Sequence, residues 1–357
     1  MRVESNKKVR AIENALLHRI NPTVFKLESN NEFRGMNLCE IGKELLVGGG
    51  VSVRGKDKAD IAKLMIMGQR DLSTSDFPLI LENVLNKTLR ADYQLANEYW
   101  NLIARETSVN DFKAKAMYQI DSANGMKELP EGDEIKYGKM QEAKQTISVK
   151  TFAEGLILTR KMIINDDMSA FERIPQKFVT DWDLLRGDMV WGMLTNNVKM
   201  DDGKTLFHAD HANLANAGAV LSEVTLAAAV LALKTQKSLS GNTLKIIPKY
   251  LICGPAQEIT ARKLLATIAP TQSSQVNVFS TMNITLIVEH RITGNEWELT
   301  ADPLAIDGLY YAYLDGNNGL RSNREDNFDT QGIKFAVTGE FGVAAIDYRG
   351  WYKNAGA

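Results

Sequence analysis

The sequence predicts a mixed α+β chain of about two domains. Residues 169–197 carry apolar side chains at three- and four-residue steps, a pattern typical of a long amphipathic helix. Residues 111–159 and 331–348 contain segments in which apolar and polar residues alternate, as in half-exposed strands. The length of 357 residues allows two domains, at roughly 100–200 residues per domain, and a sizeable core.

The first part of the chain predicts short helices. Residues 36–46 and 61–66 carry apolar residues on either side of a turn at residues 48–50, which is three glycines. Ser75 or Asp76 can cap a further helix, with Pro78 in its first turn. The helical period of this further segment continues through Leu81, Val84, Leu85 and Leu89, and Tyr93, Ala96 and Trp100 can extend it.

Residues 111–159 predict a projecting hairpin. Two alternating segments, 113–120 and 144–151, flank a turn-rich stretch at 124–133. Ile147 and Val149 share one face of the second segment. A lone hairpin is marginally stable in water, so we expect a neighbouring chain to stabilise this one.

The long helix at 169–197 is the strongest helical signal. Ser169 and Glu172 fit a capping box, and Pro175 is expected to kink the first turn or restart the helix. We expect the apolar stripe to pack in the core rather than to bind a cofactor. The stripe consists of Phe171, Ile174, Phe178, Trp182, Leu185, Met189 and Met193.

The remaining chain alternates helices and strands. Ser222 is expected to cap a helix over 223–233, and Gly254 and Pro255 to open another that ends near 268–270. Gly339 and Gly342 suggest a bend between two C-terminal strands. The expected strands are 250–253, 284–288, 296–299, 309–314, 333–338 and 343–348.

Composition excludes several classes of protein. The longest apolar run, residues 226–233, is shorter than the ~18–20 residues of a membrane helix, and the N-terminus lacks the apolar stretch of a signal peptide. We therefore expect a soluble protein made in a cytoplasm. Cys39 and Cys253 are far apart, which argues against a disulfide framework and a zinc knuckle.

Charge is unevenly distributed along the chain. The net charge of −2 predicts no global attraction to nucleic acid. Residues 1–75 nevertheless hold 13 Lys and Arg against 9 Asp and Glu, whereas the rest holds 29 against 35. A solvated basic segment explains this bias, and a segment that faces a polyanion is the alternative.

One segment matches the pattern of a phosphate-binding loop. Residues 50–56 fit G-x-x-x-x-G-K, but Asp57 follows where a phosphate loop has Ser or Thr. A carboxylate there would repel phosphate, and the preceding segment is helical rather than a strand. We interpret the motif as a turn between two helices.

A second segment could hold a metal ion. His208, Asp210 and His211 offer two imidazoles and a carboxylate, which could bind zinc. The spacing differs from the helical H-E-x-x-H motif of metalloproteases, and no further Cys or His lies near in sequence. A hydrogen-bonded loop is the favoured interpretation, in which Asp210 satisfies an imidazole or a backbone N–H.

Other catalytic arrangements are not evident in the sequence. There is no G-x-S-x-G motif, and Cys253 lies in an apolar strand, as a packed thiol does. The acidic pairs at 166–167 and 201–202 lie at helix boundaries, where capping explains them. We therefore predict no catalytic, cofactor-binding or metal-binding residues.

Several segments, in order, resemble one protein family. The early ones are 33–36, 74–78, 86–90, 164–167 and 174–175, and a weaker one is 271–277. The most specific are 206–214 (LFHADHANL) and 347–354 (DYRGWYKN). Together the chain resembles tailed-phage major capsid proteins of the Mu-type head-protein group, and most of all the capsid half of prohead protease–capsid fusion proteins.

The resemblance implies the Hong Kong 97-type shell fold. It implies an N-terminal helical segment or arm at 1–75, an arm helix at 76–110 and an extended hairpin loop at 111–159. It further implies a peripheral domain with the long spine helix at 160–245, an axial domain at 246–330 and a return to the peripheral domain at 331–357. The protease half of the fusion proteins has no counterpart here.

The function implied by the resemblance is structural. A subunit of this type self-assembles into hexamers and pentamers of an icosahedral shell around double-stranded DNA. Its implied partners are copies of itself, a portal, decoration or scaffold proteins and packaged DNA, without a membrane, in a virion assembled in the bacterial host cytoplasm. The alternative is an enzyme, either a metal-dependent hydrolase that uses His208, Asp210 and His211 or a residual prohead protease.

Overall fold

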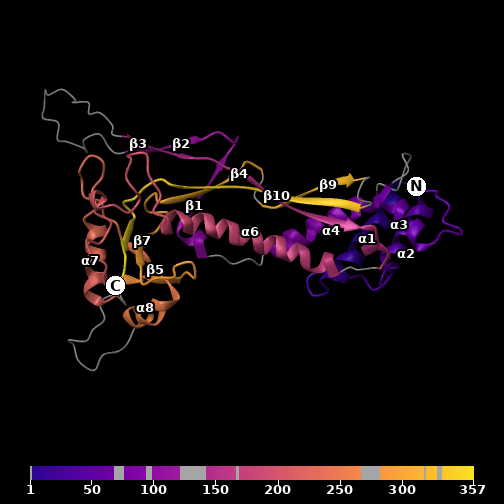
Figure 1. The fold of residues 1–357 in the computed structure, drawn as a ribbon, viewed down its shortest axis with the longest axis horizontal. Coiled ribbons are helices and arrows are strands. Elements are labelled where there is room, and N and C mark those ends of the chain that lie inside the picture. The colour runs from indigo at the N-terminus through magenta and orange to yellow at the C-terminus, as the bar shows by residue number, and fades with distance from the viewer. Residues whose placement is uncertain are drawn as a thin grey trace, which may run out of the picture. The chain divides into compact units, whose positions relative to one another are not determined.

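The computed structural model divides the chain into two compact units. The first unit comprises residues 1–97, 151–185 and 316–340, and the second comprises 98–150, 186–315 and 341–357. Helix α6 and strand β10 each contribute residues to both units. Figure 1 labels the elements. The structure describes residues 2–67, 76–93, 99–120, 142–165, 169–266, 282–316, 319–327 and 332–357.

Among the described residues, five helices belong wholly to the first unit. They are α1 (Arg2–Ile20), α2 (Leu38–Gly48), α3 (Lys58–Met67), α4 (Asp76–Tyr93) and α5 (Arg160–Ile164). Helix α2 begins with a capping box, in which the side chain of Asn37 accepts from the N–H of Glu40 and the Glu40 carboxylate accepts from the N–H of Asn37. The two short helices expected within residues 36–70 are confirmed as α2 and α3.

The glycine-rich motif at 50–56 lies in the loop between α2 and α3. Gly50 and Gly55 have φ of 81° and 77°, in the left-handed region that glycine adopts without strain. The motif thus forms the turn that the sequence favoured. Helix α4 begins at Asp76 and ends at Tyr93, and Trp100 lies in a separate 3₁₀ turn, η1 (Tyr99–Leu102), so it does not extend the helix.

The N-terminal helices share the core of the first unit with later segments. Aliphatic side chains of α1 to α4 pack with residues from β4, α5, the start of α6 and β10. The described residues 2–67 are therefore packed into this unit, with helices α1, α2 and α3 joined by loops. Among the buried members of the cluster are Ile12, Leu16, Leu38, Ile41, Ile61, Phe77, Leu81, Leu158, Ile163, Phe178, Ile333 and Phe335.

In the described part of the first unit, three strands contribute residues, namely β4 (Lys150–Thr159), β9 (Arg321–Asn327) and β10 (Gly332–Ala345). Strand β10 neighbours β4 and pairs antiparallel with β9. It continues through Gly339 and Gly342 as one strand, so the predicted division into two strands is wrong. The absence of a side chain at Gly339 makes room for Trp182, whose ring atoms would lie 2.7 Å from an added Cβ.

Helix α6 (Ser169–Thr195) is the expected long helix and continues through Pro175. The predicted capping side chains of Ser169 and Glu172 lie outside the described part of the structure. In the first unit the helix buries Phe178 and Trp182, as its stripe predicts.

The predicted stripe fails in the second half of α6. Met189 and Met193 are only half-buried, whereas Val190, Trp191 and Leu194 are at most 1% exposed. Side chains advance by about 100° per residue, so these three lie on a different face from the methionines. Both faces are apolar in sequence, and packing within the second unit selects between them.

The second unit contains two sheets and a hairpin. The end of β10 pairs antiparallel with β8 (Leu309–Leu314), which pairs parallel with β1 (Ala104–Val109). The other sheet has the order β11 (Trp351–Asn354), β7 (Trp297–Ala301), β5 (Pro248–Cys253) and β6 (Thr285–Val288). The hairpin pairs β2 (Lys115–Ile120) with β3 (Glu142–Ile147).

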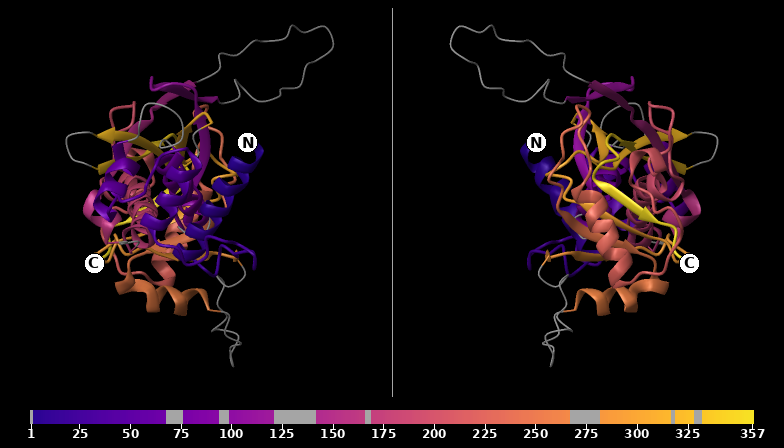
Figure 2. Two further views of the ribbon diagram at one scale, coloured as in Figure 1. Left: turned by 90° about the vertical axis from the view of Figure 1, so that its right-hand side faces the viewer. Right: turned by 90° about the vertical axis from the view of Figure 1, so that its left-hand side faces the viewer.

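Two helices flank the second sheet. They are α7 (Glu223–Lys234), capped by Ser222 as expected, and α8 (Glu258–Leu265), which follows the 3₁₀ turn η3 (Pro255–Gln257). Helix α7 lies beside β11 in the right-hand view of Figure 2. Within the described residues, no helix is long and apolar enough to cross a membrane.

The base of the hairpin has a core within its own chain. Ile147 and Val149 are 1% and 3% exposed, and they pack with Val109, Ala312 and Ile346 of the same unit. The expectation that these two side chains need a neighbouring chain for burial is wrong. The turn-rich stretch at 124–133 lies outside the described residues.

Candidate functional site

A polar loop follows α6 and contains the candidate metal ligands. Asn197 takes a left-handed conformation, with φ of 46°, and ends the helix. Its amide side chain donates to the carbonyl of Phe207 at 3.0 Å and accepts from the N–H of Phe207 at 2.7 Å. This pair of bonds closes the loop before the His208 segment begins.

His211 is buried and bonded at both ring nitrogens. Nδ1 lies 3.1 Å from the carbonyl oxygen of Leu206, and Nε2 lies 2.7 Å from Oδ2 of Asp202. Both partners are acceptors, so both bonds form only when the ring carries two protons. The ring also stacks on Tyr348, with centroids 3.7 Å apart and planes within 4°. The imidazole therefore fastens the loop rather than presenting a lone pair.

The other two candidate ligands are also engaged within the loop. His208 Nδ1 accepts from the N–H of Asp210 at 3.1 Å, and Oδ2 of Asp210 lies 2.8 Å from Nζ of Lys204. The hydrogen bond from Lys204 lowers the pKa of Asp210. Among the described residues, no group of three or more His, Cys, Asp and Glu side chains is placed to hold a metal ion.

Asp202 is held as a carboxylate. Burial works to raise its pKa, but hydrogen bonds from His211 and from the N–H of Lys204 outweigh that effect, so the pKa lies below its ordinary value. In this form Asp202 accepts the hydrogen bond from Nε2 of His211.

The loop is connected to the C-terminal strand. The side chain of Asn213, fully buried, donates to the carbonyls of Leu206 at 2.8 Å and Tyr348 at 3.3 Å. The N–H of Lys353 then donates to the carbonyl of Asn213 at 2.9 Å. These bonds join the two segments that the sequence marked as most specific, 206–214 and 347–354.

Lys353 lies at the centre of a buried ionic cluster. Its ammonium lies 2.8 Å from Glu296 and 3.1 Å from Oε1 of Glu298, which is 1% exposed. Burial, the largest cause, and the like charge of Glu296 raise the pKa of Glu298, although Lys353 opposes this. Among the described residues, Oε2 of Glu298 has no hydrogen-bond partner. Two carboxylates thus share one ammonium, and the more buried one has the raised pKa.

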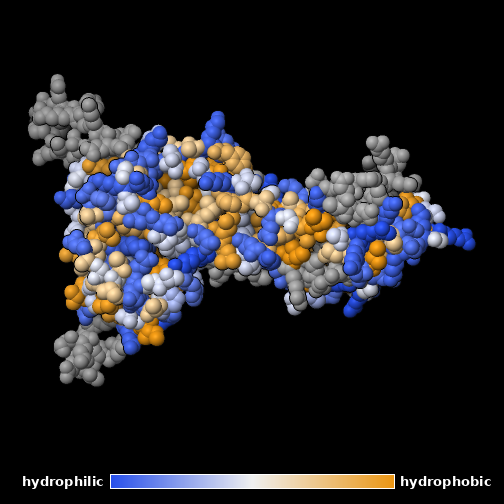
Figure 3. All heavy atoms as spheres, in the orientation of Figure 1, coloured by the Kyte–Doolittle hydropathy of each residue, from blue (hydrophilic) through white to orange (hydrophobic). Residues whose placement is uncertain are grey.

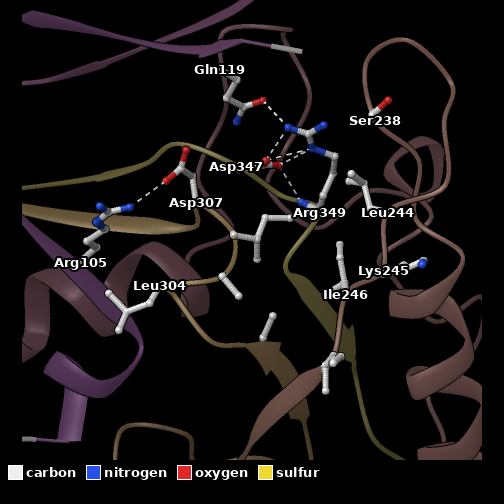
Figure 4. Close-up of a pocket in the computed structure, with 14 residues that line it drawn as sticks. Arg105, Gln119, Ser238, Leu244, Lys245, Ile246, Leu304, Asp307, Asp347 and Arg349 are labelled. Carbon is white, nitrogen blue, oxygen red and sulfur yellow. Dashed lines mark hydrogen bonds and ion pairs between the residues drawn. The ribbon is translucent and has the colours of Figure 1, made fainter. Parts of the chain in front are cut away.

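A second buried ion pair lies in the segment 346–349. Nη2 of Arg349 lies 2.6 Å from Oδ2 of Asp347 and donates to Oε1 of Gln119 at 3.1 Å (Figure 4). The amide of Gln119 also donates to the carbonyl of Ile346. Burial raises the pKa of Asp347, with Arg349 acting in the opposite direction. This arrangement ties the hairpin strand β2 to the C-terminal segment.

A cavity of about 440 Å³ adjoins this ion pair. Its lining includes Arg105, Asp307 and the Asp347–Arg349 pair together with aliphatic residues such as Leu244 and Ile246 (Figure 4). Arg105 lies 3.5 Å from Asp307, Arg349 pairs with Asp347, and Lys245 is a further charged residue of the lining. No nucleophile with an adjacent base lines the cavity among the described residues.

The buried cysteine Cys253 is unsuited to catalysis. Its side chain is fully buried, and burial raises the pKa of the thiol to about 11. The thiolate is the nucleophilic form, so this group is inert near neutral pH.

A family model decides the identity. The model described as phage capsid protein matches residues 142–354, more than half of the chain. The chain belongs to the phage capsid protein family. The phage capsid family predicted from the sequence is confirmed, as are the role of a capsid protein and the mixed α+β fold class.

Solved capsid structures are similar at low identity. The capsid of an empty GTA particle is 14% identical, with 73% of this chain and 91% of that chain covered and a TM-score of 0.49. The Mycobacterium phage Patience structure is 8% identical, with 79% and 88% covered and a TM-score of 0.48. The bacteriophage JBD30 procapsid is 13% identical, with 77% and 75% covered and a TM-score of 0.42. The comparison with curated proteins returned no match.

The sequence found some of these residues and missed others. It singled out His208, Asp210 and His211, and the structure brings them together in a hydrogen-bonded loop. It did not single out the buried cluster around Lys353 or the pair around Arg349. A charged residue inside a strand of large apolar residues, such as Glu298 between Trp297 and Leu299, was the available signal. The Mu-type subgroup stays a prediction.

Proposed function

We propose that this capsid protein is the main building block of its shell and assembles as hexamers and pentamers of an icosahedral head around double-stranded DNA. The observation that carries the proposal is the family match over residues 142–354, which include α6 and nearly all of the buried polar clusters. A shell subunit needs a rigid body, and buried, paired charges join distant chain segments in the second unit.

The proposed role is structural rather than enzymatic. Both ring nitrogens of His211, Oδ2 of Asp210 and the ammonium of Lys353 bond to partners within the chain. A general base or a metal ligand needs an available lone pair that faces a substrate or an ion. We therefore propose no catalytic, cofactor or metal site for the described residues.

The proposed partners follow from the role as a shell subunit. Copies of the chain are the main partners, with a portal, with decoration or scaffold proteins, and with packaged DNA bound without sequence specificity. The basic balance of residues 1–75 suits the inner side of a shell, where counterion exchange accommodates phosphate. Assembly in the bacterial host cytoplasm, with the domain boundaries given from the sequence, completes the proposal.

Electron microscopy of the purified full-length protein tests this function. We expect rings or closed shells, and sedimentation far faster than that of a 39.7 kDa monomer. A chelator should change neither the particles nor their number. A monomer under all assembly conditions, together with a hydrolytic activity that the chelator abolishes and His211→Ala removes, would instead support the enzyme alternative.

A further inference from the structure

Helix α7 is apolar on the side that faces solvent as well as on the side that faces the core. Leu226 and Leu233 are fully buried against the second sheet, with Val230 beside them. On the other side Val224 is 78% exposed and Leu231 is 62% exposed. Hydrophobic atoms reach the surface in Figure 3 where Figure 1 shows α7. A helix that is apolar on all sides is normally buried on all sides, so we expect another surface to pack on the outer side of α7.

The exposed side of α7 has the spacing of a helix-packing surface. Val224, Ala227, Ala228 and Leu231 are all exposed and recur at i, i+3, i+4 and i+7. We call these four residues the outer stripe. The two alanines at its centre are small enough to let another backbone approach closely.

Two unpaired charges mark one flank of the outer stripe. Glu223 and Lys234 are exposed at opposite ends of the helix, and among the described residues neither has an ion-pair partner. At about 100° per residue they point in nearly the same direction, roughly 90° from the centre of the stripe. Thr225 and Ala232, which are uncharged, occupy the opposite flank.

We propose that the outer stripe of α7 packs against the outer stripe of α7 in a second copy of this chain, with the two helices antiparallel about a two-fold axis. Such an axis lies between the helices at right angles to them and brings the same flank of both together. Glu223 of each copy then lies opposite Lys234 of the other, offset by about 3 Å along the helix. A parallel pair would place these charges on opposite flanks.

The charges and the family both favour a second copy over another partner. One charge of each sign, placed symmetrically on one flank, makes the surface complementary to itself, as an isologous contact requires. The inference rests on the proposed function, because a shell holds copies of the chain side by side. Four side chains form a small contact, so we expect it to be weak alone and strengthened by the many contacts of a shell.

Disulfide trapping in the full-length protein tests the contact. Cys39 and Cys253 are buried, so a cysteine introduced on α7 is the accessible one. Ala228→Cys lies next to the two-fold axis and should form disulfide-linked dimers after mild oxidation. Lys234→Cys alone should not, because its two copies are about 20 Å apart along the helices. A mixture of Glu223→Cys and Lys234→Cys, one of them carrying a size tag, should form the mixed dimer.

Matched substitutions complete the experiment. Leu231→Asp in the Ala228→Cys background should reduce dimer yield at least tenfold. Ile259→Asp on α8, which replaces another exposed aliphatic residue, should leave the yield unchanged. The yield of disulfide-linked dimer is measured for both variants, in assembled particles and in concentrated unassembled subunit.

The outcomes separate this proposal from the function. No dimer of Ala228→Cys in either state overturns the α7 contact, and particles that still form leave the shell function standing. Self-linking of Lys234→Cys as efficient as that of Ala228→Cys overturns the antiparallel geometry. Linking of α7 to a different protein, or to another surface of the same chain, overturns the isologous pairing.

Discussion

Gly342 shows how a single residue constrains the second unit. A Cβ at this position would collide with the backbone carbonyl of Ser148. Backbone atoms cannot move aside as a flexible side chain can, so Gly342→Ala should lower the free energy of unfolding by about 1–3 kcal/mol. Gly155→Ala in β4 is the matched control, because its nearest neighbour would lie 3.8 Å from the new Cβ. That substitution should change stability by less than about 1 kcal/mol in a urea titration. Equal losses of stability in Gly342→Ala and Gly155→Ala would contradict the close approach of Gly342 to the Ser148 carbonyl.

Glu298, again a single residue, predicts that the free energy of unfolding depends on pH. The folded state raises the pKa of this carboxyl above its ordinary value of 4.5, mainly through burial. The folded chain therefore holds its proton to higher pH than the unfolded chain does, and stability falls as the pH rises from about 4.5 through the folded pKa. Glu298→Gln removes this titration. As the pH rises through this range, the unfolding free energy of the wild type should therefore fall relative to that of Glu298→Gln.

Asp202 predicts a pH dependence of stability of the opposite sign and therefore serves as a control. Its pKa is lowered in the folded state, so its contribution is present above the ordinary value of 3.8 and is lost as the pH falls through the folded pKa. Asp202→Asn should remove stability that is present at neutral pH, and the loss should shrink in acid. A pH profile of urea midpoints for both variants checks the two signs together.

At the scale of elements, buried side chains of the hairpin and of helix α6 stabilise the second unit. Ile147→Ala should cost about 2–5 kcal/mol of subunit stability, because the side chain is 1% exposed in its own chain. Trp191→Ala, at a fully buried position of α6, should cost about 3–5 kcal/mol. Leu185→Ala should cost less, since Leu185 is half-buried. Denaturant unfolding of the unassembled subunit measures all three. A stable Ile147→Ala subunit that fails only in assembly would restore the view that a neighbouring chain buries the hairpin.

At the scale of the whole molecule, the N-terminal helices belong to the folded subunit. Ile12, Leu16 and Leu38 lie in the core cluster that also contains Phe178 and Phe335. Deletion of residues 1–75 would expose the remaining half of this core, so the shortened chain should be insoluble or should lose the unfolding transition of the first unit. Soluble yield and circular dichroism check this. A soluble, fully folded product that still assembles would mean that residues 1–75 are a dispensable arm.

The sequence by itself determined most elements and the family. The helices at α2, α3, α4 and α7 and the strands β5 to β8 have short-range periodicity and capping residues that act locally, so they could be predicted. The helix α1 and the strands β1, β9 and β11 were missed, and β9 (RSNREDN) has no alternation of apolar residues to reveal it.

Tertiary structure alone decided which apolar faces are buried and which charges meet. Ile147 is buried against Ala312 and Ile346 of its own chain, more than one hundred residues away. In α6, Val190 and Trp191 are buried in place of Met189, although both faces are apolar in sequence. The pairings of Arg349 with Gln119 and of Lys353 with Glu298 likewise join distant segments. Local periodicity carries no information about such partners. The cost of burying an unpaired charge enforces these pairings only once the chain has folded.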